Sequence, residues 1–475
     1  MDTKVEVSKS EALLEPSIIV IFGITGDLSK RYLLPAIFHL IKGHNLHEKT
    51  EIIGITRGTT TVEEIFDSVS LCQNEDNSVC DPEALGRMKQ HTTMKQMDLD
   101  SSEDYAALYK ELNAIEDKIG ECMNRLYYLS IPPLAYTPVI DLLGQNNLHA
   151  SCQHNNAKTR LLVEKPFGFD LASAEKLIQE TNKVFKEDQI FRIDHYLAKE
   201  TVQNILTFRF QNPIFEPLWN EQYVAGISIT AFEQIGIQGR AAFYDPLGAL
   251  RDFIQSHLMQ VLAIVTMDKP SSFDSEHIHI AKQELMEHIQ EVPGEKIAER
   301  VIRGQYVGYR DEVKKADSVT ETYASVIVYI DSPRWQGVPI RLATGKAMDK
   351  RKTEVRISFH GTEGHADNHL RFRIQPNEGI ELDLMTKKPG FQEETQSTVM
   401  DFTYNQEFKN HGYPDAYERV LVDAIRGDRT LFASSEEVLS SWRVLQPVLD
   451  NWATHSDDLR EYAPGSKDLA ADPIE

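Results

Sequence analysis

The sequence predicts two domains of different class: an α/β domain built on a parallel sheet, followed by an α+β domain with a large, mostly antiparallel sheet. The chain has 475 residues, more than one ordinary hydrophobic core accommodates. Up to about residue 190, short apolar runs alternate with helix-type patterns, whereas after about residue 200 longer strands of alternating residues dominate. We expect a flexible tail at 1–16, the first domain at 17–198 and the second at 199–475.

The first domain begins with an apolar run at 17–22, which has the length of a buried parallel strand. A glycine-containing turn and an apolar-periodic stretch follow it. This layout is typical of Rossmann-like domains, in which backbone N–H groups and a helix N-terminus face a pyrophosphate. Because Thr25 and Leu28 stand where the usual G-x-G-x-x-G pattern has glycines, a generic turn between a strand and a helix is the alternative. The predicted cofactor-binding loop contains Gly23, Thr25, Gly26, Asp27, Leu28, Ser29 and Lys30.

Three further parallel strands are expected, at 51–56, 125–130 and 159–164. The first of these ends at Arg57. An arginine at this position favours a 2′-phosphate on the adenosine ribose, so Arg57 indicates NADP, with NAD as a weaker cofactor; a solvated loop arginine is the alternative. Functional groups of open α/β sheets gather at the carboxyl ends of the strands. This rule places Tyr128 near the cofactor and Lys165 within reach of both cofactor and substrate.

The segment 192–200, Arg-Ile-Asp-His-Tyr-Leu-Ala-Lys-Glu, concentrates an acid, an imidazole, a phenol and an ammonium. On a helix, His195 and Lys199 are four residues apart and face the same way. With Tyr196 beside them they present donors to one point, which suits a bound phosphate, while Asp194 serves a different neighbour. A polar helix start with a salt bridge is the alternative.

The second domain is predicted to contain long alternating strands in one sheet, with helices on one side. The strands are expected at 224–232, 325–331, 355–360, 370–374 and 380–385. The acidic stretch 274–299 is expected to form a solvated helix pair. Within it, His277 and His279 have the spacing to share a strand face and bind a metal, but no cysteine or carboxylate cluster accompanies them. We therefore expect no metal site.

Six motifs carry a resemblance to a known family over most of the chain. They are GITGDLSK (23–30), EKPFG (164–168), RIDHYLAKE (192–200), RDFIQSHLMQ (251–260), GKAMDKR (345–351) and DAYER (415–419). In this order they resemble the glucose-6-phosphate dehydrogenase family. The resemblance implies NADP-dependent oxidation of glucose 6-phosphate to 6-phosphogluconolactone, the first step of the oxidative pentose phosphate pathway. It also implies a homodimer or homotetramer formed through the C-terminal sheet.

The resemblance further implies roles for particular side chains. His257 matches the general base that takes the proton from the C1 hydroxyl while hydride leaves C1 for the nicotinamide. Asp194 matches the carboxylate that orients this histidine and stabilises its charged form. His195, Tyr196 and Lys199 match the phosphate clamp. The groups around the sugar match Lys165, Glu233, Asp252 and Lys346, with Arg351 and Gln375 at more peripheral positions.

Departures from the family pattern change what is expected. Ala198 replaces the family's usual glycine, which matters if that backbone has a positive φ. The chain also ends in a short acidic tail, where relatives have an aromatic-rich segment. At the second, structural NADP site of animal relatives, an arginine, a tyrosine and a lysine are replaced by Ala343, Glu381 and Asp383, which disfavours a polyanion. The residues that keep part of the basic set are Lys352, Arg356 and Arg373. We expect one NADP per subunit.

Composition argues against nucleic acid and membranes as partners. The formal net charge is −23, which repels polyanions and anionic membranes, so anionic ligands require local positive groups. We see no run of about 18 apolar residues, and the polar opening residues have no signal-peptide core. Four cysteines in a chain of this length form no disulfide framework, so we expect a reducing, cytoplasmic location.

Two other functions fit parts of the sequence. One is another NAD(P)-dependent sugar or sugar-phosphate oxidoreductase with a similar cofactor domain, which also has a Glu-Lys-Pro segment. That function gives no reason for the cluster from Asp194 to Lys199. The other is a non-catalytic NADP-responsive regulator, which loss of the base or of its orienting acid would indicate, but His257 and Asp194 are both present.

Overall fold

The computed structural model describes residues 14–69, 81–152, 157–361, 368–408 and 414–470. The chain forms two compact units. Unit 1 comprises residues 1–165, 178–193 and 414–432, and unit 2 comprises residues 166–177, 194–413 and 433–475. Of the tail expected at 1–16, residues 1–13 lie outside the described residues.

Unit 1 is built on a seven-stranded sheet. In chain order its strands are β1 (Ser17–Phe22), β2 (Glu51–Thr56), β3 (Thr92–Gln96), β4 (Asn124–Leu129), β5 (Thr159–Glu164), β6 (Ile190–Ile193) and β15 (Phe432–Ala433). Across the sheet the order is β15-β6-β5-β4-β1-β2-β3, and the pairings from β6 to β3 are all parallel. β1 is buried along its whole length. Helices cover both faces of such a parallel sheet, so a central strand like β1 consists almost entirely of apolar residues.

Helices connect the parallel strands of unit 1, as crossover connections require. They are η1 (Ser29–Leu33), α1 (Leu34–Lys42), α2 (Val62–Asp67), α3 (Pro82–Gln90), α4 (Ser102–Ile119), η2 (Pro133–Ala135), α5 (Tyr136–Gln145), η3 (Glu187–Gln189) and α14 (Ala416–Arg426), while α6 (Leu171–Asn182) contributes to both units. Local sequence sets several of their ends. The side chain of Ser101 accepts from Asp104 N at the start of α4, and Gly120 ends that helix with a φ of 85°.

Unit 2 is built on a nine-stranded sheet. Its strands are β7 (Val224–Phe232), β8 (Val301–Tyr306), β9 (Tyr323–Val328), β10 (Ile340–Gly345), β11 (Lys352–Phe359), β12 (His369–Gln375), β13 (Gly379–Lys387), β14 (Thr395–Thr403) and β16 (Leu459–Tyr462). Across the sheet the order is β14-β13-β12-β11-β7-β10-β9-β8-β16. Six neighbouring pairs are antiparallel, and β7–β10 and β8–β16 are parallel. The expected large, mostly antiparallel sheet is confirmed.

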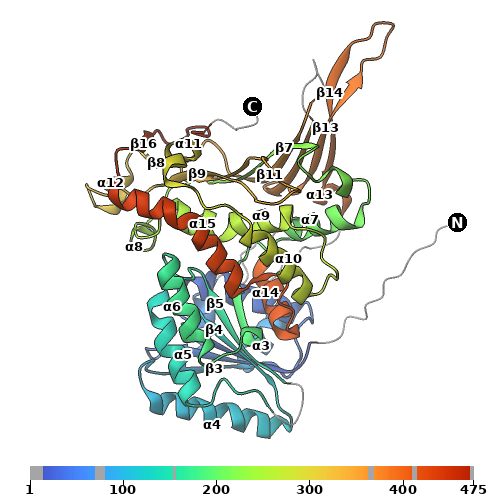
Figure 1. Ribbon diagram of the computed structural model, residues 1–475. Helices are drawn as coiled ribbons and strands as arrows, with labels where there is room; N and C mark the ends of the chain where they lie inside the picture. The colour runs from blue at the N-terminus through green and yellow to red at the C-terminus, as the bar shows by residue number, and fades with distance from the viewer. Residues whose placement is uncertain (1–13, 70–80, 153–156, 362–367, 409–413, 471–475) are drawn as a thin grey trace, which may run out of the picture. The chain divides into compact units, whose positions relative to one another are not determined.

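Helices of unit 2 accompany one face and the edges of this sheet. They are α7 (Glu200–Gln211), η4 (Glu216–Leu218), α8 (Ala241–Tyr244), η5 (Leu250–Leu258), α9 (Met259–Thr266), α10 (Ser275–Glu287), η6 (Gly294–Lys296), α11 (Ile297–Arg300), α12 (Tyr309–Val313), α13 (Tyr404–Glu407) and α15 (Ser435–Thr454). Figure 1 shows α7, α9 and α15 on that face, and the hairpin of β13 and β14 extending beyond the other strands.

The stretch expected as a solvated helix pair is partly buried. Only α10 is a long helix there, and it is followed by the short η6 and α11. On α10, Lys282 is fully buried and its Nζ lies 2.8 Å from Oε2 of Glu437 in α15. His277 and His279 lie on this helix rather than on a strand, and His279 contacts Glu437 at 2.7 Å. The expectation of a solvated pair is therefore wrong, because one helix face packs against α15.

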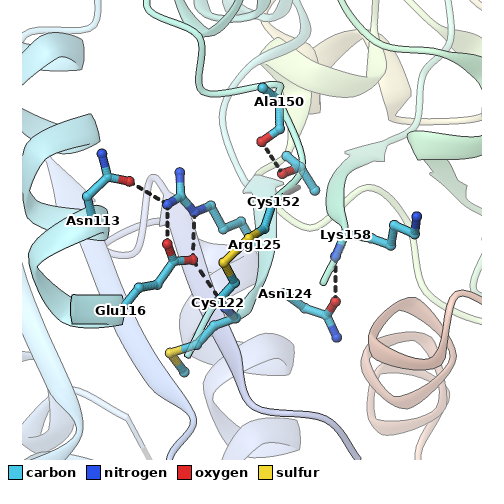
Figure 2. The surroundings of a disulfide bond; sticks show 10 residues. Asn113, Glu116, Cys122, Asn124, Arg125, Ala150, Cys152 and Lys158 are labelled. Atoms are coloured by element: carbon cyan, nitrogen blue, oxygen red, sulfur yellow. Dashed lines mark hydrogen bonds and ion pairs between the residues drawn. A yellow bond between two sulfur atoms is a disulfide. The ribbon is translucent and has the colours of Figure 1, made fainter. Parts of the chain in front are cut away.

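Cys122 and Cys152 form a disulfide, which differs from the expectation that the cysteines are reduced. The two residues are 30 positions apart and precede the neighbouring strands β4 and β5. Figure 2 shows the bond beside Arg125, whose guanidinium donates to Glu116 at 2.6 Å. The chain's other cysteines, Cys72 and Cys80, lie outside the described residues.

Candidate active site

The candidate base and its orienting acid come from two segments of unit 2. Asp194 directly follows β6 in the chain, and His257 lies in η5. Nδ1 of His257 is 2.6 Å from Oδ1 of Asp194, and the two side chains are 1% and 2% exposed. A carboxylate on Nδ1 fixes the tautomer in which Nε2 is the basic nitrogen, and it stabilises the imidazolium. The pair has the geometry of a general base with its orienting acid.

The helix that holds His257 has an unusual shape. η5 is a π-helix of nine residues, from Leu250 to Leu258. In an α-helix, with 3.6 residues per turn, residues five apart point in different directions. The wider turn of a π-helix, with its i→i+5 bonds, brings them closer to one side. Asp252 and His257 are five residues apart, so the π-helix helps to present both to the same region.

Aromatic rings surround the imidazole of His257. The ring of Tyr196 stacks on it, with centroids 4.4 Å apart and an interplanar angle of 26°. His195 and Phe253 meet it edge-on, at centroid distances of 4.6 Å and 5.2 Å. Burial raises the pKa of the Tyr196 hydroxyl, which keeps the phenol protonated. These contacts hold the base in one orientation inside an apolar setting.

The segment after β6 does not form the expected helix. Consecutive turns precede α7, which begins at Glu200. The backbone N–H of Tyr196 donates to Oδ1 of Asp194 at 3.0 Å, because an aspartate side chain can bond its own backbone two residues on and so favours a turn over a helix. The expectation that His195 and Lys199 lie on one helix face is therefore wrong. His195 lies instead in the turn that Asp194 initiates, and Lys199 follows the turn residues.

Ala198 lies within these turns and is buried. Among the described residues it is not one of those with a positive φ. Its backbone is therefore in a conformation that any L-residue adopts readily. The glycine usual in the family is not needed here for the conformation of the backbone.

Gln375 connects the members of the candidate clamp. Its Oε1 accepts from Lys199 Nζ at 2.5 Å and from the guanidinium of Arg351 at 3.1 Å. Its Nε2 donates to the Tyr196 hydroxyl at 3.3 Å and to Oγ1 of Thr353 at 3.1 Å. The structure thus places Gln375 at the centre of these side chains, rather than at the periphery where the sequence placed it.

A second group of charged side chains lies at the ends of two parallel strands. Glu233 follows β7 and Lys346 follows β10, and because these strands pair in parallel their carboxyl ends meet. The Lys346 ammonium forms an ion pair with Glu233 and lies 4.0 Å from Oδ2 of Asp252. It also lies 5.0 Å from the ring centroid of Tyr244. The group offers both hydrogen-bond donors and acceptors, as recognition of sugar hydroxyls requires.

The glycine loop of unit 1 runs from β1 into η1 and α1. Gly23 has a φ of 85°, and a Cβ atom there would lie 2.3 Å from the carbonyl oxygen of Ser130, so only glycine fits. The Ser29 hydroxyl is within 2.8 Å of the Ser130 hydroxyl and donates to Gly23 O at 3.1 Å. Asp27 forms an exposed ion pair with Arg31 at 2.6 Å. These contacts hold the loop against the end of β4.

Three other predicted cofactor residues lie on the strands of unit 1 or directly after them. Because β2, β4 and β5 belong to one parallel set, Arg57 and Lys165 follow strands that end at the same edge as the glycine loop. Arg57 is exposed. Tyr128 is fully buried and its hydroxyl donates to Glu164 at 2.5 Å; burial raises the pKa of this phenol. Tyr128 thus sits inside the unit, one residue before the end of β4.

Sequence reasoning missed two neighbours of these groups. Phe253 precedes His257 by four residues, a helical spacing that predicts proximity. Thr353 is the cross-strand partner of Gln375 in the antiparallel pair of β11 and β12. No local pattern indicates that pairing, because it depends on the register of two strands.

Known proteins match the chain along almost its whole length. Residues 20–204 match the family model for the NAD binding domain of glucose-6-phosphate dehydrogenase, and residues 206–472 match the model for its C-terminal domain. The chain belongs to the glucose-6-phosphate dehydrogenase family. The glucose-6-phosphate 1-dehydrogenase of Borreliella burgdorferi is 39% identical over 456 residues, which cover 92% of each chain. The Arabidopsis thaliana relative named glucose-6-phosphate 1-dehydrogenase 5, cytoplasmic, is 37% identical and covers 91% of this chain and 85% of its own.

Solved structures of glucose-6-phosphate dehydrogenases share this architecture. One, in complex with its substrate glucose-6-phosphate, has a TM-score of 0.88 and 34% identity, with 96% of each chain covered. Another, from Mycobacterium avium, has a TM-score of 0.81 and 32% identity, with 95% of each chain covered. The resemblance noted in the sequence, the Rossmann-like class of the N-terminal domain and the α+β class of the C-terminal domain are confirmed.

Two kinds of feature are absent from the described residues. No helix in those parts of the chain is long and apolar enough to cross a membrane. The same residues contain no group of three or more histidine, cysteine, aspartate or glutamate side chains suited to a metal ion.

Proposed function

We propose that this chain oxidises glucose 6-phosphate to 6-phosphogluconolactone with NADP as the hydride acceptor. The observation that carries the proposal is the buried pair of His257 and Asp194, 2.6 Å apart, with Tyr196 of the phosphate clamp stacked on the base. A regulator without catalysis gives no reason to bury an imidazole against a carboxylate beside such a clamp. The names of the relatives and the substrate bound in one solved family member support the same reaction.

In the proposed reaction, Nε2 of His257 removes the proton from the C1 hydroxyl of the cyclic sugar. Bound NADP supplies the nicotinamide that accepts the hydride from C1. Asp194 holds the imidazole in the required tautomer and stabilises the positive charge that develops on it. Lys346, Glu233 and Asp252 hold the hydroxyls of the sugar, so that C1 is presented in one orientation.

The phosphate of the substrate would bind to His195, Tyr196 and Lys199, with Arg351 and Gln375 behind them. Because the chain carries a formal net charge of −23, a dianionic substrate requires local positive groups. Lys199 and Arg351 both donate to the same oxygen of Gln375. Gln375 therefore sets the spacing of two cations, which suits a multidentate phosphate.

The residues of unit 1 suit a dinucleotide. Gly23 closes a turn that no side chain could occupy, and the turn leads into a helix, which is the arrangement that binds a pyrophosphate. Arg57 would pair with the 2′-phosphate and so favour NADP over NAD. The proposed cofactor residues are Gly23, Thr25, Gly26, Asp27, Leu28, Ser29, Lys30, Arg57, Tyr128 and Lys165.

We also propose a single NADP per subunit. At the positions where animal relatives bind a structural NADP, Glu381 forms ion pairs with Arg371 and Arg373, and Arg373 also contacts Asp401 at 2.5 Å. The basic side chains that a second phosphate would need are thus already paired with carboxylates. Calorimetric titration of nucleotide-free protein should give one site per subunit, and a second tight site would contradict the proposal.

Four broader properties belong to the same proposal. The domains would span 17–198 and 199–475. The protein would act in the cytoplasm, as the name of the Arabidopsis relative says of that protein, although a reducing compartment would open the bond between Cys122 and Cys152. It would form homodimers or homotetramers through the sheet of unit 2 and require no metal.

The decisive experiment is an assay of NADPH formation by absorbance. Purified protein would be incubated with NADP and either glucose 6-phosphate or free glucose. We expect rapid turnover of glucose 6-phosphate and at least 100-fold lower kcat/KM for free glucose, because the lost phosphate contacts amount to about 3 kcal/mol or more. Equal activity on both sugars would contradict the phosphate clamp, and no activity on either would contradict the reaction.

A further inference from the structure

We propose that Tyr462 is a positioning residue for Lys346, and that the C-terminal segment 462–466 is a strap that fixes the loop of Lys346 in the sugar site. The inference rests on the proposed role of Lys346. Tyr462 ends β16, which forms one edge of the sheet of unit 2. Nothing in the six sequence motifs points to this segment, since it lies beyond the last of them.

The hydroxyl of Tyr462 belongs to a buried chain of hydrogen bonds that ends on Lys346. Tyr462 Oη donates to the carbonyl oxygen of Lys346 at 2.7 Å. It lies 2.8 Å from Oγ1 of Thr322, which in turn accepts from the N–H of Tyr306 at 2.9 Å. Because Tyr462 donates its phenol proton to the carbonyl oxygen of Lys346, the Thr322 hydroxyl must donate to the phenol oxygen of Tyr462. The direction of every bond in this chain is thereby set.

A second set of contacts joins the strap to the same loop through the backbone. The N–H of Gly465 donates to the carbonyl oxygen of Ala347 at 2.8 Å, and the N–H of Asp349 donates to Ser466 O at 2.9 Å. Met348 and Ser466 form an isolated parallel bridge. The strap therefore contacts each residue of the loop from 346 to 349.

The loop needs such support because its backbone is strained. Ala347 has a φ of 52°, a left-handed conformation that residues other than glycine rarely adopt. Strain of this kind persists only where the surroundings impose it. The carbonyl groups on both sides of the strained φ, those of Lys346 and Ala347, are the two that the strap binds.

The position of the Lys346 ammonium depends on this backbone. A lysine side chain is long and flexible, so packing alone places its charge poorly. Here the ammonium is paired with Glu233 and lies 4.0 Å from Asp252, while Tyr462 and Thr322 fix the backbone from which it extends; Lys346 N donates to Thr322 O at 2.9 Å. Displacement of the carbonyl would move the ammonium away from a sugar hydroxyl and misplace the substrate.

A purely structural role for Tyr462 has to be distinguished from a role in positioning Lys346. Its ring lies in a tyrosine-rich core with Tyr306, Tyr309 and Tyr323, so any loss of that ring would destabilise unit 2. Tyr462→Phe keeps the ring and removes only the hydroxyl. Tyr306→Phe is the matched control, because its hydroxyl belongs to the same core but bonds Ile237 N at 3.3 Å and Glu312 at 2.5 Å rather than Lys346.

The experiment compares kcat and KM for glucose 6-phosphate, KM for NADP and the midpoint of thermal unfolding in the two variants. We expect Tyr462→Phe to lower kcat/KM for glucose 6-phosphate by about 5- to 30-fold, the factor that corresponds to the free energy of one buried hydrogen bond if all of it is lost from the transition state, with KM for NADP unchanged. Tyr306→Phe should lose similar thermal stability but change kcat/KM by less than about twofold. Equal kinetic effects of the two variants, or none for Tyr462→Phe, would overturn the proposal.

A double-mutant cycle then tests whether Tyr462 acts through Lys346. Lys346→Ala alone should lower kcat/KM, and adding Tyr462→Phe to it should lower kcat/KM no further, because the group that Tyr462 positions is gone. Additive losses would show that Tyr462 acts by another route and would overturn the proposal. No loss in Lys346→Ala would overturn the assignment of Lys346 to the sugar site, and the role of Tyr462 with it.

Discussion

Tyr196 stacks on His257, with ring centroids 4.4 Å apart, so a residue of the proposed phosphate clamp touches the candidate base directly. The ammonium of Lys199 lies 4.3 Å from the centroid of the same Tyr196 ring. In the proposed function, binding of the phosphate and orientation of the base would thus share one side chain. A substrate that fills the clamp would also fix the ring against which His257 rests.

Two substitutions of Tyr196 distinguish the role of its hydroxyl from the role of its ring. We expect Tyr196→Phe to raise KM for glucose 6-phosphate by about 5- to 10-fold with a small change in kcat, because only a hydroxyl is lost. Tyr196→Leu should also lower kcat, because the stacked ring is lost with it. Steady-state kinetics of both variants check this, and equal kcat values would show that the ring does not support the base.

His257→Asn should abolish most turnover and leave substrate binding largely intact. Asparagine cannot act as a general base, and removal of such a base commonly costs 10²- to 10⁴-fold in rate. The measurements are kcat and the dissociation constant of glucose 6-phosphate, with His47→Asn, at an exposed turn of unit 1, as the control. Retention of more than about a tenth of wild-type kcat would exclude His257 as the base.

Lys199→Ala and His195→Ala should chiefly raise KM for glucose 6-phosphate. The phosphate is remote from C1 and is bound alike in the ground and transition states, so its contacts contribute to binding more than to the chemical step. KM for NADP should change little in either variant. If it rose more than KM for the sugar phosphate, the assignment of the clamp would be wrong.

Arg57→Ala should lower kcat/KM for NADP far more than for NAD. The charge-assisted bond to a 2′-phosphate is worth about 1.5–3 kcal/mol, and NAD lacks that group. Parallel assays with the two cofactors provide the test, with Arg87→Ala in α3 as the control for loss of a surface charge. Similar losses for both cofactors would leave Arg57 as a loop residue without a role in selectivity.

The stability of the protein should depend on Asp423 in a pH-dependent way. Burial raises the pKa of this carboxyl to about 6, and Arg419, at 2.8 Å, lowers it only in part. The folded pKa exceeds the unfolded value of 3.8, so the folded state keeps a proton that the unfolded chain loses. Stability therefore falls as pH rises from about 4 to about 6, and the cost, about 3 kcal/mol, is full above that range.

Asp423→Asn removes this titration. Relative to the wild type, the variant should gain stability as pH rises from about 4 to about 7. Thermal or urea unfolding across that range measures the difference. Asp450→Asn, an exposed carboxylate in α15, serves as the control. A difference that does not change with pH would contradict the raised pKa.

Strands were the part of the fold that the sequence predicted best. The ranges 17–22, 51–56, 159–164 and 224–232 coincide with β1, β2, β5 and β7. The apolar run of β1 reflects burial on both faces, a strong local pattern. The strand expected at 325–331 is β9 at Tyr323–Val328, because strand ends depend on the neighbours with which they pair.

Features that depend on distant residues, and one local competition between two hydrogen bonds, were not predictable in the same way. The turns at Asp194 replace an expected helix because a side-chain hydrogen bond competes with the helical one. The bond between Cys122 and Cys152 depends on β4 and β5 being neighbours. The central place of Gln375 depends on which strand lies beside β12. The resemblance paired Asp194 with His257, and the fold shows that contact, whereas the contacts of Gln375 came only from the fold.

The π-helix at 250–258 has a consequence for how the chain tolerates changes of length. Its wide turn brings Asp252 and His257 toward one region. Removal of one residue between them would leave the two residues four apart, the spacing that an ordinary α-helix brings to one face. The identity of every remaining residue would be unchanged. The length of this segment and the type of helix it forms are therefore coupled: a segment shorter by one residue can present the same two side chains from an α-helix, whereas the present length presents them from a π-helix.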